Sequence, residues 1–245
     1  MPATPAWPPK SLPRLFVRTP LGEGASVEID AGQANYLGNV MRLGDGEHVL
    51  LFDGGSGEWI ARIAEAGRKR MTLVVEQRTR ELEAVPDLWL AFAPVKRAQT
   101  DWLIEKATEL GIARLLPVIT QRTIVERVKL ERLEAIAVEA AEQCNRTTVP
   151  GIDAPQSLDA FLKAHSGRTL YFADEGGGSA AAGTFKPGPA TILTGPEGGF
   201  TDEERTAIRA EPGATAISLG PRILRAETAA LAAITAYMAL AGDWR

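Results

Sequence analysis

The alternation of hydrophobic and polar positions changes near residue 80 of this 245-residue chain. Before that point, short apolar or alternating runs are separated by glycine-rich turns, a pattern typical of β-strands. The predicted strands are 15–17, 26–29, 48–52, 59–63 and 71–76. A helix is predicted at 31–41, because apolar residues recur at helical spacing from Tyr36 to Met41. Several short strands with one helix indicate a small barrel-like β-rich domain over residues 14–80.

After a proline-containing linker at 81–87, predicted strands and helices alternate. The strands are 88–93, 115–119, 169–173, 190–194 and 215–219, and the helices are 100–110, 129–144, 157–165, 202–210 and 226–240. Alternation of this kind predicts a parallel sheet with helices on both faces. The sequence therefore predicts an α/β domain over 88–245, preceded by the β-rich domain and by a flexible, proline-rich arm at 1–13.

Composition narrows the function. The net charge of −4 argues against a protein that coats nucleic acid by bulk attraction, so an RNA partner would be held by local patches. No apolar run approaches the roughly 20 residues of a membrane helix, and the proline-rich start lacks the apolar core of a secretory signal. The lone Cys144 fits the reducing cytoplasm. His48, His165 and this cysteine have no zinc-site spacing, and no metal is expected.

Two glycine-containing loops, 194–200 and 219–228, each follow an apolar predicted strand. Open α/β sheets bind ligands in the crevice at the carboxyl ends of their strands. Neither loop has the glycine spacing of a phosphate-binding motif, and Glu197 would repel a phosphate. A nucleoside without a phosphate fits better, with its adenine between apolar side chains such as Leu193 and Leu224. S-adenosylmethionine is such a ligand. The alternative is that both loops are ordinary tight turns whose glycines supply positive φ.

Two arginines, Arg222 and Arg225, stand before the last predicted helix, beside the positive end of its macrodipole. That position favours anions, and a local rule broken without evident compensation tends to mark a functional site. One interpretation is that Arg225 faces an electron-rich substrate in a cleft at the end of a strand. The alternative is that both arginines pair with acids such as Glu227.

The two loops resemble the paired signatures of the ribosomal RNA small subunit methyltransferase E family, which belongs to the SPOUT superfamily of knotted methyltransferases. The signatures are Thr194-Gly-Pro-Glu-Gly-Gly-Phe200 and Leu219-Gly-Pro-Arg-Ile-Leu-Arg-Ala-Glu-Thr-Ala229. Supporting matches lie at 36–37, 40–43, 51–54, Lys96, 101–102, 105–111, 139–143, Arg146 and 149–150. The resemblance covers about residues 14–240. It departs at Ala226, where a threonine is expected, and at Asn145, where a glycine is expected.

The resemblance implies transfer of the methyl group of S-adenosylmethionine to N3 of one uridine in the 16S ribosomal RNA of the small ribosomal subunit. It also implies a PUA-like barrel that binds RNA, a C-terminal domain with a deep trefoil knot, and a homodimer. The alanine-rich last helix permits close approach in a dimer, although core packing explains it equally well. Two alternatives keep the fold: methylation of another RNA position such as a ribose 2′-hydroxyl, or a non-catalytic RNA-binding assembly factor.

The resemblance and the chemistry of the reaction together assign residues. Uracil N3 carries a proton at neutral pH, so a cation against the carbonyl oxygens would stabilise the anion, and Arg225 is the candidate. Glu227 is the candidate proton acceptor, with a favourable place in the first helical turn as the alternative. The predicted cofactor contacts are Leu193, Thr194, Gly195, Glu197, Gly198, Leu219, Gly220, Ile223, Leu224 and Thr228. At Gly198, a side chain should block the approach of the backbone to the cofactor. The predicted phosphate contacts are Arg14, Arg18, Arg42, Lys96, Arg97, Arg122 and Arg146.

Overall fold

The computed structural model describes residues 12–67, 70–125, 127–165 and 167–244, and the chain divides into two compact units. The first unit consists of residues 1–83 with 145–148, and the second of residues 84–144 with 149–245. No sequence pattern indicated that residues 145–148 join the first unit. The arm predicted at 1–13 lies, except for its last two residues, outside the described residues.

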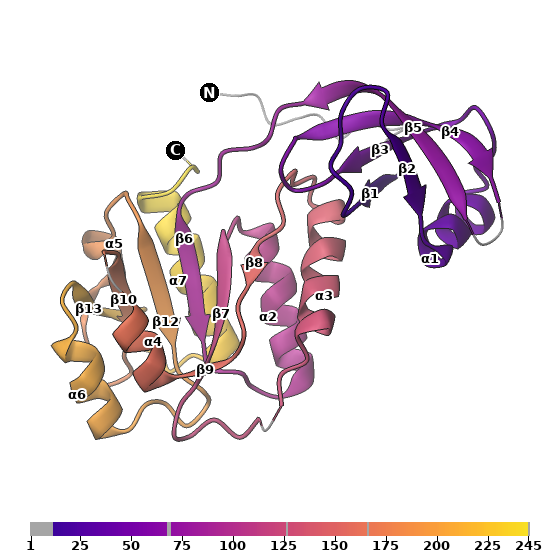
Figure 1. The fold of residues 1–245 in the computed structure, drawn as a ribbon. Helices are drawn as coiled ribbons and strands as arrows, with labels where there is room; N and C mark the ends of the chain where they lie inside the picture. Colours follow the sequence, from indigo (N-terminus) through magenta and orange to yellow (C-terminus); the bar gives the residue numbers. More distant parts are fainter. Residues whose placement is uncertain (1–11, 68–69, 126, 166, 245) are drawn as a thin grey trace. The chain divides into compact units, whose positions relative to one another are not determined.

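The first unit is built on a curved five-stranded sheet with the order β1-β3-β4-β5-β2. Its strands are β1 (Arg14–Phe16), β2 (Ser26–Ile29), β3 (His48–Phe52), β4 (Glu58–Ala66) and β5 (Met71–Arg80). β1 pairs with β3 in parallel, and all other pairs are antiparallel. The β4–β5 pair has three register shifts, and because bulges bend a strand, these two long strands curl around the apolar core (Figure 1).

The helix predicted at 31–41 is regular only in its first half. It consists of α1 (Ala31–Asn35) followed by a π-helical segment, Tyr36–Val40. The amide of Met41 closes the wider turn with a bond of 2.9 Å, and Arg42 then adopts a left-handed backbone with φ of 59°. π-Helical turns and left-handed non-glycine residues are uncommon and often occur at functional sites.

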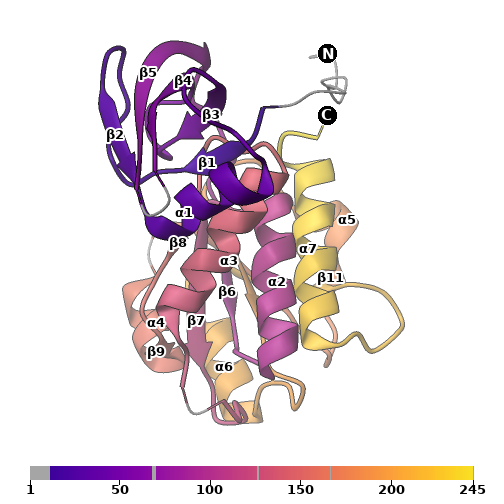
Figure 2. The ribbon, with the colours of Figure 1, turned by 90° about the vertical axis from the view of Figure 1, so that its right-hand side faces the viewer.

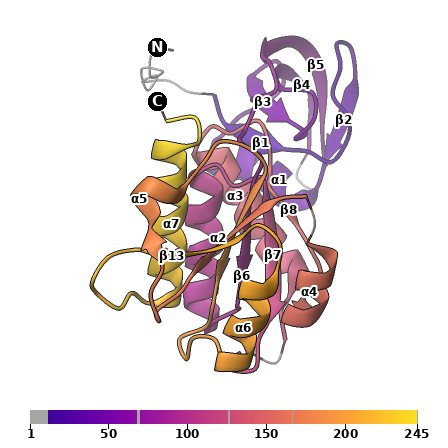
Figure 3. The same cartoon turned by 90° about the vertical axis from the view of Figure 1, so that its left-hand side faces the viewer.

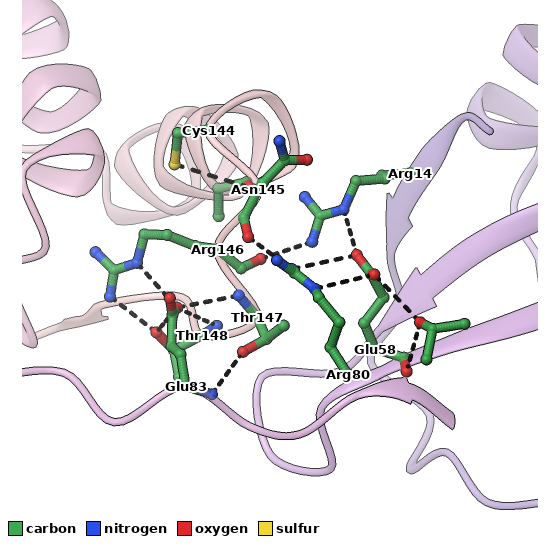
Figure 4. A network of polar contacts seen from close by, with 11 residues as sticks. Arg14, Glu58, Arg80, Glu83, Cys144, Asn145, Arg146, Thr147 and Thr148 are labelled. Carbon is green, nitrogen blue, oxygen red and sulfur yellow. Dashed lines mark hydrogen bonds and ion pairs between the residues drawn. The ribbon is translucent and has the colours of Figure 1, made fainter. Parts of the chain in front are cut away.

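A buried carboxylate, Glu58, binds two arginines of the first unit. Arg14 Nε donates to Glu58 Oε2 at 2.6 Å, and Arg80 Nε donates to Glu58 Oε1 at 3.1 Å. Both arginines also donate to the segment 145–148, Arg14 to the carbonyl of Arg146 at 2.8 Å and Arg80 to that of Asn145 at 2.7 Å (Figure 4). Charged donors therefore fix this distant segment to the strands of the sheet.

Glu83 binds the same segment from the other side. Its Oε1 accepts from the amides of Thr147 and Thr148 at 3.0 and 2.9 Å, and from the guanidinium of Arg146 at 3.4 Å (Figure 4). Asn145 enters the segment with φ of 64°, a conformation that asparagine tolerates and that glycine adopts freely. This positive φ is the physical reason why a glycine is expected at position 145.

The second unit is an eight-stranded sheet in which every pair is parallel, as predicted. Seven strands follow the order β11-β13-β10-β12-β6-β7-β8, and β9 also pairs with β7. The bounds are β6 (Leu88–Phe92), β7 (Arg114–Ile119), β8 (Gly151–Ile152), β9 (Gln156–Ser157), β10 (Thr169–Ala173), β11 (Ser179–Ala180), β12 (Ala190–Thr194) and β13 (Ala214–Ser218). β8, β9 and β11 were not predicted, because two residues carry no periodicity.

Helices cover both faces of this sheet (Figures 2 and 3). One face packs against α2 (Arg97–Glu109), α3 (Leu130–Gln143) and α7 (Ala226–Leu240), with the short α5 (Ala181–Thr184) beside α7. The other face packs against α4 (Leu158–Ala164) and α6 (Asp202–Ala210). Alternate strand residues enter the two cores, for example Leu90 on the first face and Ala91 on the second. In the part of the chain that the structure describes, no helix is long and apolar enough to cross a membrane.

Candidate functional site

The carboxyl ends of three adjacent parallel strands surround a cavity of about 360 Å³. β10 lies between β13 and β12 in the sheet, so the loops that follow these strands meet at one edge. The cavity is lined from the ends of β10, β12 and β13 and from the first turn of α7. The two loops predicted from the sequence are thus brought together, and between them lies the loop after β10, which the sequence did not assign to the site.

The loop after β12 forms one wall. Its lining residues are Thr194, Gly195, Pro196, Glu197, Gly199 and Phe200. The Gly199 amide donates to the Pro196 carbonyl at 2.9 Å and closes a tight turn. Gly199 has φ of 66°, and a side chain there would overlap the Glu175 carboxylate. This loop therefore requires glycine at position 199 for both backbone and space.

The prediction that Gly198 is the point of close approach is corrected. Gly198 is exposed and lies outside the lining of the cavity, and a side chain added there would meet only the flexible stem of Arg122. Gly199 occupies the cavity wall instead. Adjacent glycines cannot be distinguished from sequence, because the difference lies in which one takes the left-handed conformation.

The loop ends in a capping box at the start of α6. The Thr201 hydroxyl accepts from the Glu204 amide at 3.2 Å, and Glu204 Oε2 accepts from the Thr201 amide at 2.9 Å. This reciprocal pair satisfies two free donors at the start of α6 and fixes where the loop ends.

The loop after β13 forms the opposite wall and supplies two arginines. Arg222 and Arg225 line the cavity, and neither side chain has a hydrogen bond or ion pair among the described residues. Arg225 is the N-cap of α7 and makes no side-chain capping bond. The interpretation in which these arginines pair with Glu227 is therefore wrong. Apolar lining comes from Leu219, Ile223 and Leu224.

Four predicted site residues do not reach the cavity. Glu227 is 7% exposed and lies one and two turns before Ala230 and Ile234 on the core-facing side of α7. Leu193 is buried in the core on the α4 and α6 face of the sheet. Thr228 and Gly198 are exposed but outside the lining. The predicted residues that do line the cavity are Thr194, Gly195, Glu197, Leu219, Gly220, Ile223, Leu224 and Arg225.

The third loop adds charged residues that the sequence analysis missed. The Asp174 side chain is fully buried, accepts from Arg209 Nη2 at 2.6 Å and pairs with Arg205 Nε at 3.2 Å. Arg205 Nη2 donates to Glu175 Oε1 at 2.5 Å. Of the three carboxylates that line the cavity, only Glu197 has no ion pair with a described residue. The rule that placed the other two loops would have found Asp174 and Glu175, since they directly follow a predicted strand.

The predicted phosphate contacts fall into three groups. For Arg14 and Arg146 the prediction of a phosphate contact is corrected, because their side chains are 7% and 6% exposed and bind Glu58 and Glu83, respectively. Arg122 donates to carbonyls of the loop after β12. The remaining four are exposed, namely Arg18, Arg42, Lys96 and Arg97. Among the described residues, no group of three or more His, Cys, Asp or Glu side chains could hold a metal ion.

Comparison with known proteins identifies the family. An RNA methyltransferase domain family matches residues 81–238, and an RNA methyltransferase PUA domain matches residues 29–76. The ribosomal RNA small subunit methyltransferase E of Rickettsia conorii is 31% identical over 226 residues, which cover 90% of this chain and 93% of that protein. The chain belongs to the ribosomal RNA small subunit methyltransferase E family. The family member from Synechocystis is 34% identical and covers 88% of this chain and 74% of its own length.

Solved structures agree with this family. The ribosomal RNA small subunit methyltransferase E of Neisseria gonorrhoeae, bound to S-adenosylmethionine, has a TM-score of 0.86 at 30% identity, over 96% of this chain and all of that one. A Legionella pneumophila protein in complex with the same cofactor has a TM-score of 0.87 at 28% identity, with the same coverage. The predicted combination of a PUA domain with an RNA methyltransferase domain built on a parallel sheet is therefore confirmed. The trefoil knot and the homodimer stay predictions.

Proposed function

We propose that this protein is a cytoplasmic enzyme that transfers the methyl group of S-adenosylmethionine to N3 of one uridine in the 16S ribosomal RNA of the small ribosomal subunit. The observation that carries the proposal is Arg225, a cation without an ion pair among the described residues, at the cavity wall of an RNA methyltransferase family member. A cation at the positive end of α7 favours an electron-rich ligand, and an ionised uracil is one.

The cavity fits the cofactor in size and chemistry. Small-molecule sites have volumes of about 300–1,000 Å³ and combine apolar walls with a few polar groups, and this cavity has about 360 Å³. Leu219 and Leu224 offer half-buried apolar surfaces for an adenine, and the backbone of 195–199 offers donors and acceptors for its edge. When bound, S-adenosylmethionine supplies an electrophilic methyl group on a sulfonium, a cation that is compatible with the nearby Glu197 carboxylate.

The residues of the cavity then account for the reaction. The Glu197 carboxylate accepts the N3 proton of the uracil, and we assign this role to Glu197 in place of Glu227, which lies on the core-facing side of α7. The Arg225 guanidinium donates to a uracil carbonyl oxygen and stabilises the negative charge that develops. The N3 lone pair forms the bond to the methyl carbon as the carbon–sulfur bond breaks. The electron pair of the broken carbon–sulfur bond stays on sulfur. Alignment of N3 with the methyl group contributes the remaining part of the rate enhancement.

The reaction is tested with isotope-labelled S-adenosylmethionine and small subunits from a strain that lacks this gene, with naked 16S ribosomal RNA in parallel. Digestion and mass spectrometry of the nucleosides should give N3-methyluridine at one site. A 2′-O-methylated nucleoside would replace the proposed target atom by the ribose hydroxyl. RNA binding without any transfer to either substrate, and without cofactor binding, would favour the assembly-factor alternative.

Two variants test the assigned roles. Arg225→Ala should lower kcat about 10²- to 10³-fold, the effect of removing one preorganised donor, and Arg225→Lys should recover part of it. Glu197→Gln should lower kcat about 10²- to 10⁴-fold, with a deficit that narrows as pH rises because hydroxide then removes the proton. Glu203→Gln, an exposed carboxylate outside this cavity, is the matched control and should retain the wild-type rate.

We also propose that the protein is a homodimer that uses the outer face of α7. Ala230 and Ala233 are buried in the core, which matches the core-packing alternative for this half of the alanine face. Ala232 is only partly buried, Ala239 is exposed and Leu240 is 42% exposed, so the other half is available for close helix approach. Light scattering after size exclusion should give twice the chain mass, and Ala239→Arg should give the monomer.

RNA phosphates are proposed to bind the exposed cations Arg18, Arg42, Lys96 and Arg97. Each alanine variant should weaken RNA binding about uniformly across sequences and reduce the slope of log K against log salt by about 1. An unchanged salt slope would remove that residue from the set.

A further inference from the structure

Arg122 makes contacts that differ from those of an arginine that waits for a phosphate. It lies in the loop that follows β7, and its Nη1 donates to the Gly198 carbonyl at 2.6 Å and to the Phe200 carbonyl at 3.4 Å. Its stem packs over Gly198, because a Cβ added to that glycine would lie 3.3 Å from Arg122 Cδ. The guanidinium and the stem therefore bind the same short segment of backbone.

That segment is a wall of the proposed cofactor cavity. Residues 195–197, 199 and 200 line the cavity, whereas Gly198 and Arg122 do not. Arg122 thus binds the wall from its outer side and leaves the inner side open to a ligand. A direct ligand contact would instead place the guanidinium in the cavity, as is found for Arg222 and Arg225.

A second contact links the same two loops. The Gln121 amide donates to Glu204 Oε1 at 2.8 Å, and Glu204 Oε2 closes the capping box at Thr201. The segment between β12 and α6 is therefore fixed at its end by Glu204 and at its middle by Arg122. Only one backbone hydrogen bond is present within the segment, from Gly199 to Pro196, so the turn itself does little to hold its shape.

The physical consequence is preorganisation. A loop with two adjacent glycines has many accessible conformations, and a ligand that orders it on binding loses affinity by that entropy. Both hydrogen bonds come from Nη1, which carries two N–H groups and can therefore donate to both carbonyl oxygens, and the guanidinium is always charged. Hydrogen bonds to charged groups are also stronger than neutral ones.

We propose that Arg122 is a positioning residue, which holds residues 195–200 in the conformation that binds S-adenosylmethionine. The inference rests on the proposed function for the identity of the ligand. It replaces the sequence prediction of an RNA phosphate contact for this arginine. In this role, Arg122 contributes to cofactor affinity in the complete absence of RNA.

The test is the dissociation constant of S-adenosylmethionine, measured by calorimetry without RNA. Arg122→Met keeps an apolar stem over Gly198 and removes the donors, and it should raise Kd about 10-fold, as expected for one lost charged hydrogen bond. Arg122→Lys should give a smaller increase. The matched control is Arg127→Ala, an exposed arginine of the same loop that has no hydrogen bond or ion pair among the described residues, and its Kd should stay within about twofold of wild type.

A second measurement separates positioning from general stability. Hydrogen exchange of the amides of 198–201 in the cofactor-free protein should be faster in Arg122→Met, while the amides of β12 and α6 exchange as in wild type. Cofactor affinity and exchange that match wild type, together with weaker RNA binding, would overturn the inference and return Arg122 to the phosphate contacts. Failure of the proposed function gives a different result: the Arg122 variants would still change Kd, but wild type would not form N3-methyluridine.

Discussion

Gly199→Ala should lower the folding stability for two reasons, each of which can be assigned to a feature of the structure. The first is conformational, because Gly199 has φ of 66° and a left-handed backbone costs a residue with a side chain roughly 1–2 kcal/mol. The second is steric, because the new methyl group would overlap the Glu175 carboxylate, which must leave Arg205. That ion pair is part-exposed, with side chains 48% and 21% exposed, so its loss adds no more than about 1 kcal/mol.

The sum is about 1–3 kcal/mol of unfolding free energy. For a domain of this size, each kcal/mol lowers Tm by about 2–4 °C, so Gly199→Ala should melt about 2–12 °C below wild type. Calorimetry of the cofactor-free protein measures this shift. Cofactor affinity should fall in the same variant, because the displaced Glu175 and Gly199 both line the cavity. Gly198→Ala is the matched control, since Gly198 has no left-handed backbone and its new methyl group would meet the stem of Arg122 at 3.3 Å without overlap.

The double variant Gly199→Ala/Glu175→Ala resolves the two penalties. Removal of the Glu175 carboxylate removes the overlap but leaves the backbone conformation, so the double variant should recover part of the loss and no more. Full recovery would mean that the left-handed backbone adds nothing. A Gly198→Ala variant that is less stable than Gly199→Ala would refute the assignment of the strained position.

Two further predictions follow from buried charge. Burial, and then the charge of Arg168, lower the pKa of His165, whose Nε2 has no hydrogen-bond partner among the described residues. The unfolded chain therefore binds a proton below about pH 6.5, whereas the folded chain binds it only at a lower pH, and stability is lost as pH falls through that range. His165→Phe should lose less stability between pH 8 and pH 5 in urea titrations. Glu58→Ala should cost about 3–5 kcal/mol, because it leaves the buried Arg14 without its carboxylate, and a loss below 1 kcal/mol in urea unfolding would contradict the role of that pair.

The alternation of strands and helices was predictable because it is a local property. Each long element of the second unit carries its own apolar periodicity. A Gly-Pro pair follows both β12 and β13, and the Thr201 capping box marks the start of α6. The π-helical segment 36–40 was not predictable in the same way. Its residues satisfy the spacing of an ordinary helix, and neither the wider turn nor the left-handed backbone of Arg42 that follows it changes that spacing.

The sequence was less informative about which parts of the chain come together in the fold. The order of strands places β10 between β12 and β13, and no local pattern encodes that order. The loop with Asp174 and Glu175 was therefore absent from the predicted site, although its strand was predicted. Residues 145–148 pose the same problem, because their partners Arg14, Arg80 and Glu83 lie far away in sequence.

Proximity in sequence also misdirected the choice of proton acceptor. Glu227 is two residues from Arg225, but Arg225 is the N-cap and Glu227 already lies within the helix. At about 100° per residue, Glu227 shares a face with the buried Ala230 and Ile234, whereas Arg225 faces the cavity. The same helix that brings the arginine to the site therefore removes its nearest acid, and this separation leaves the guanidinium free for a substrate. In the proposed mechanism the carboxylate that accepts the proton therefore comes from another loop, and the tight turn after β12 presents Glu197 to the same cavity.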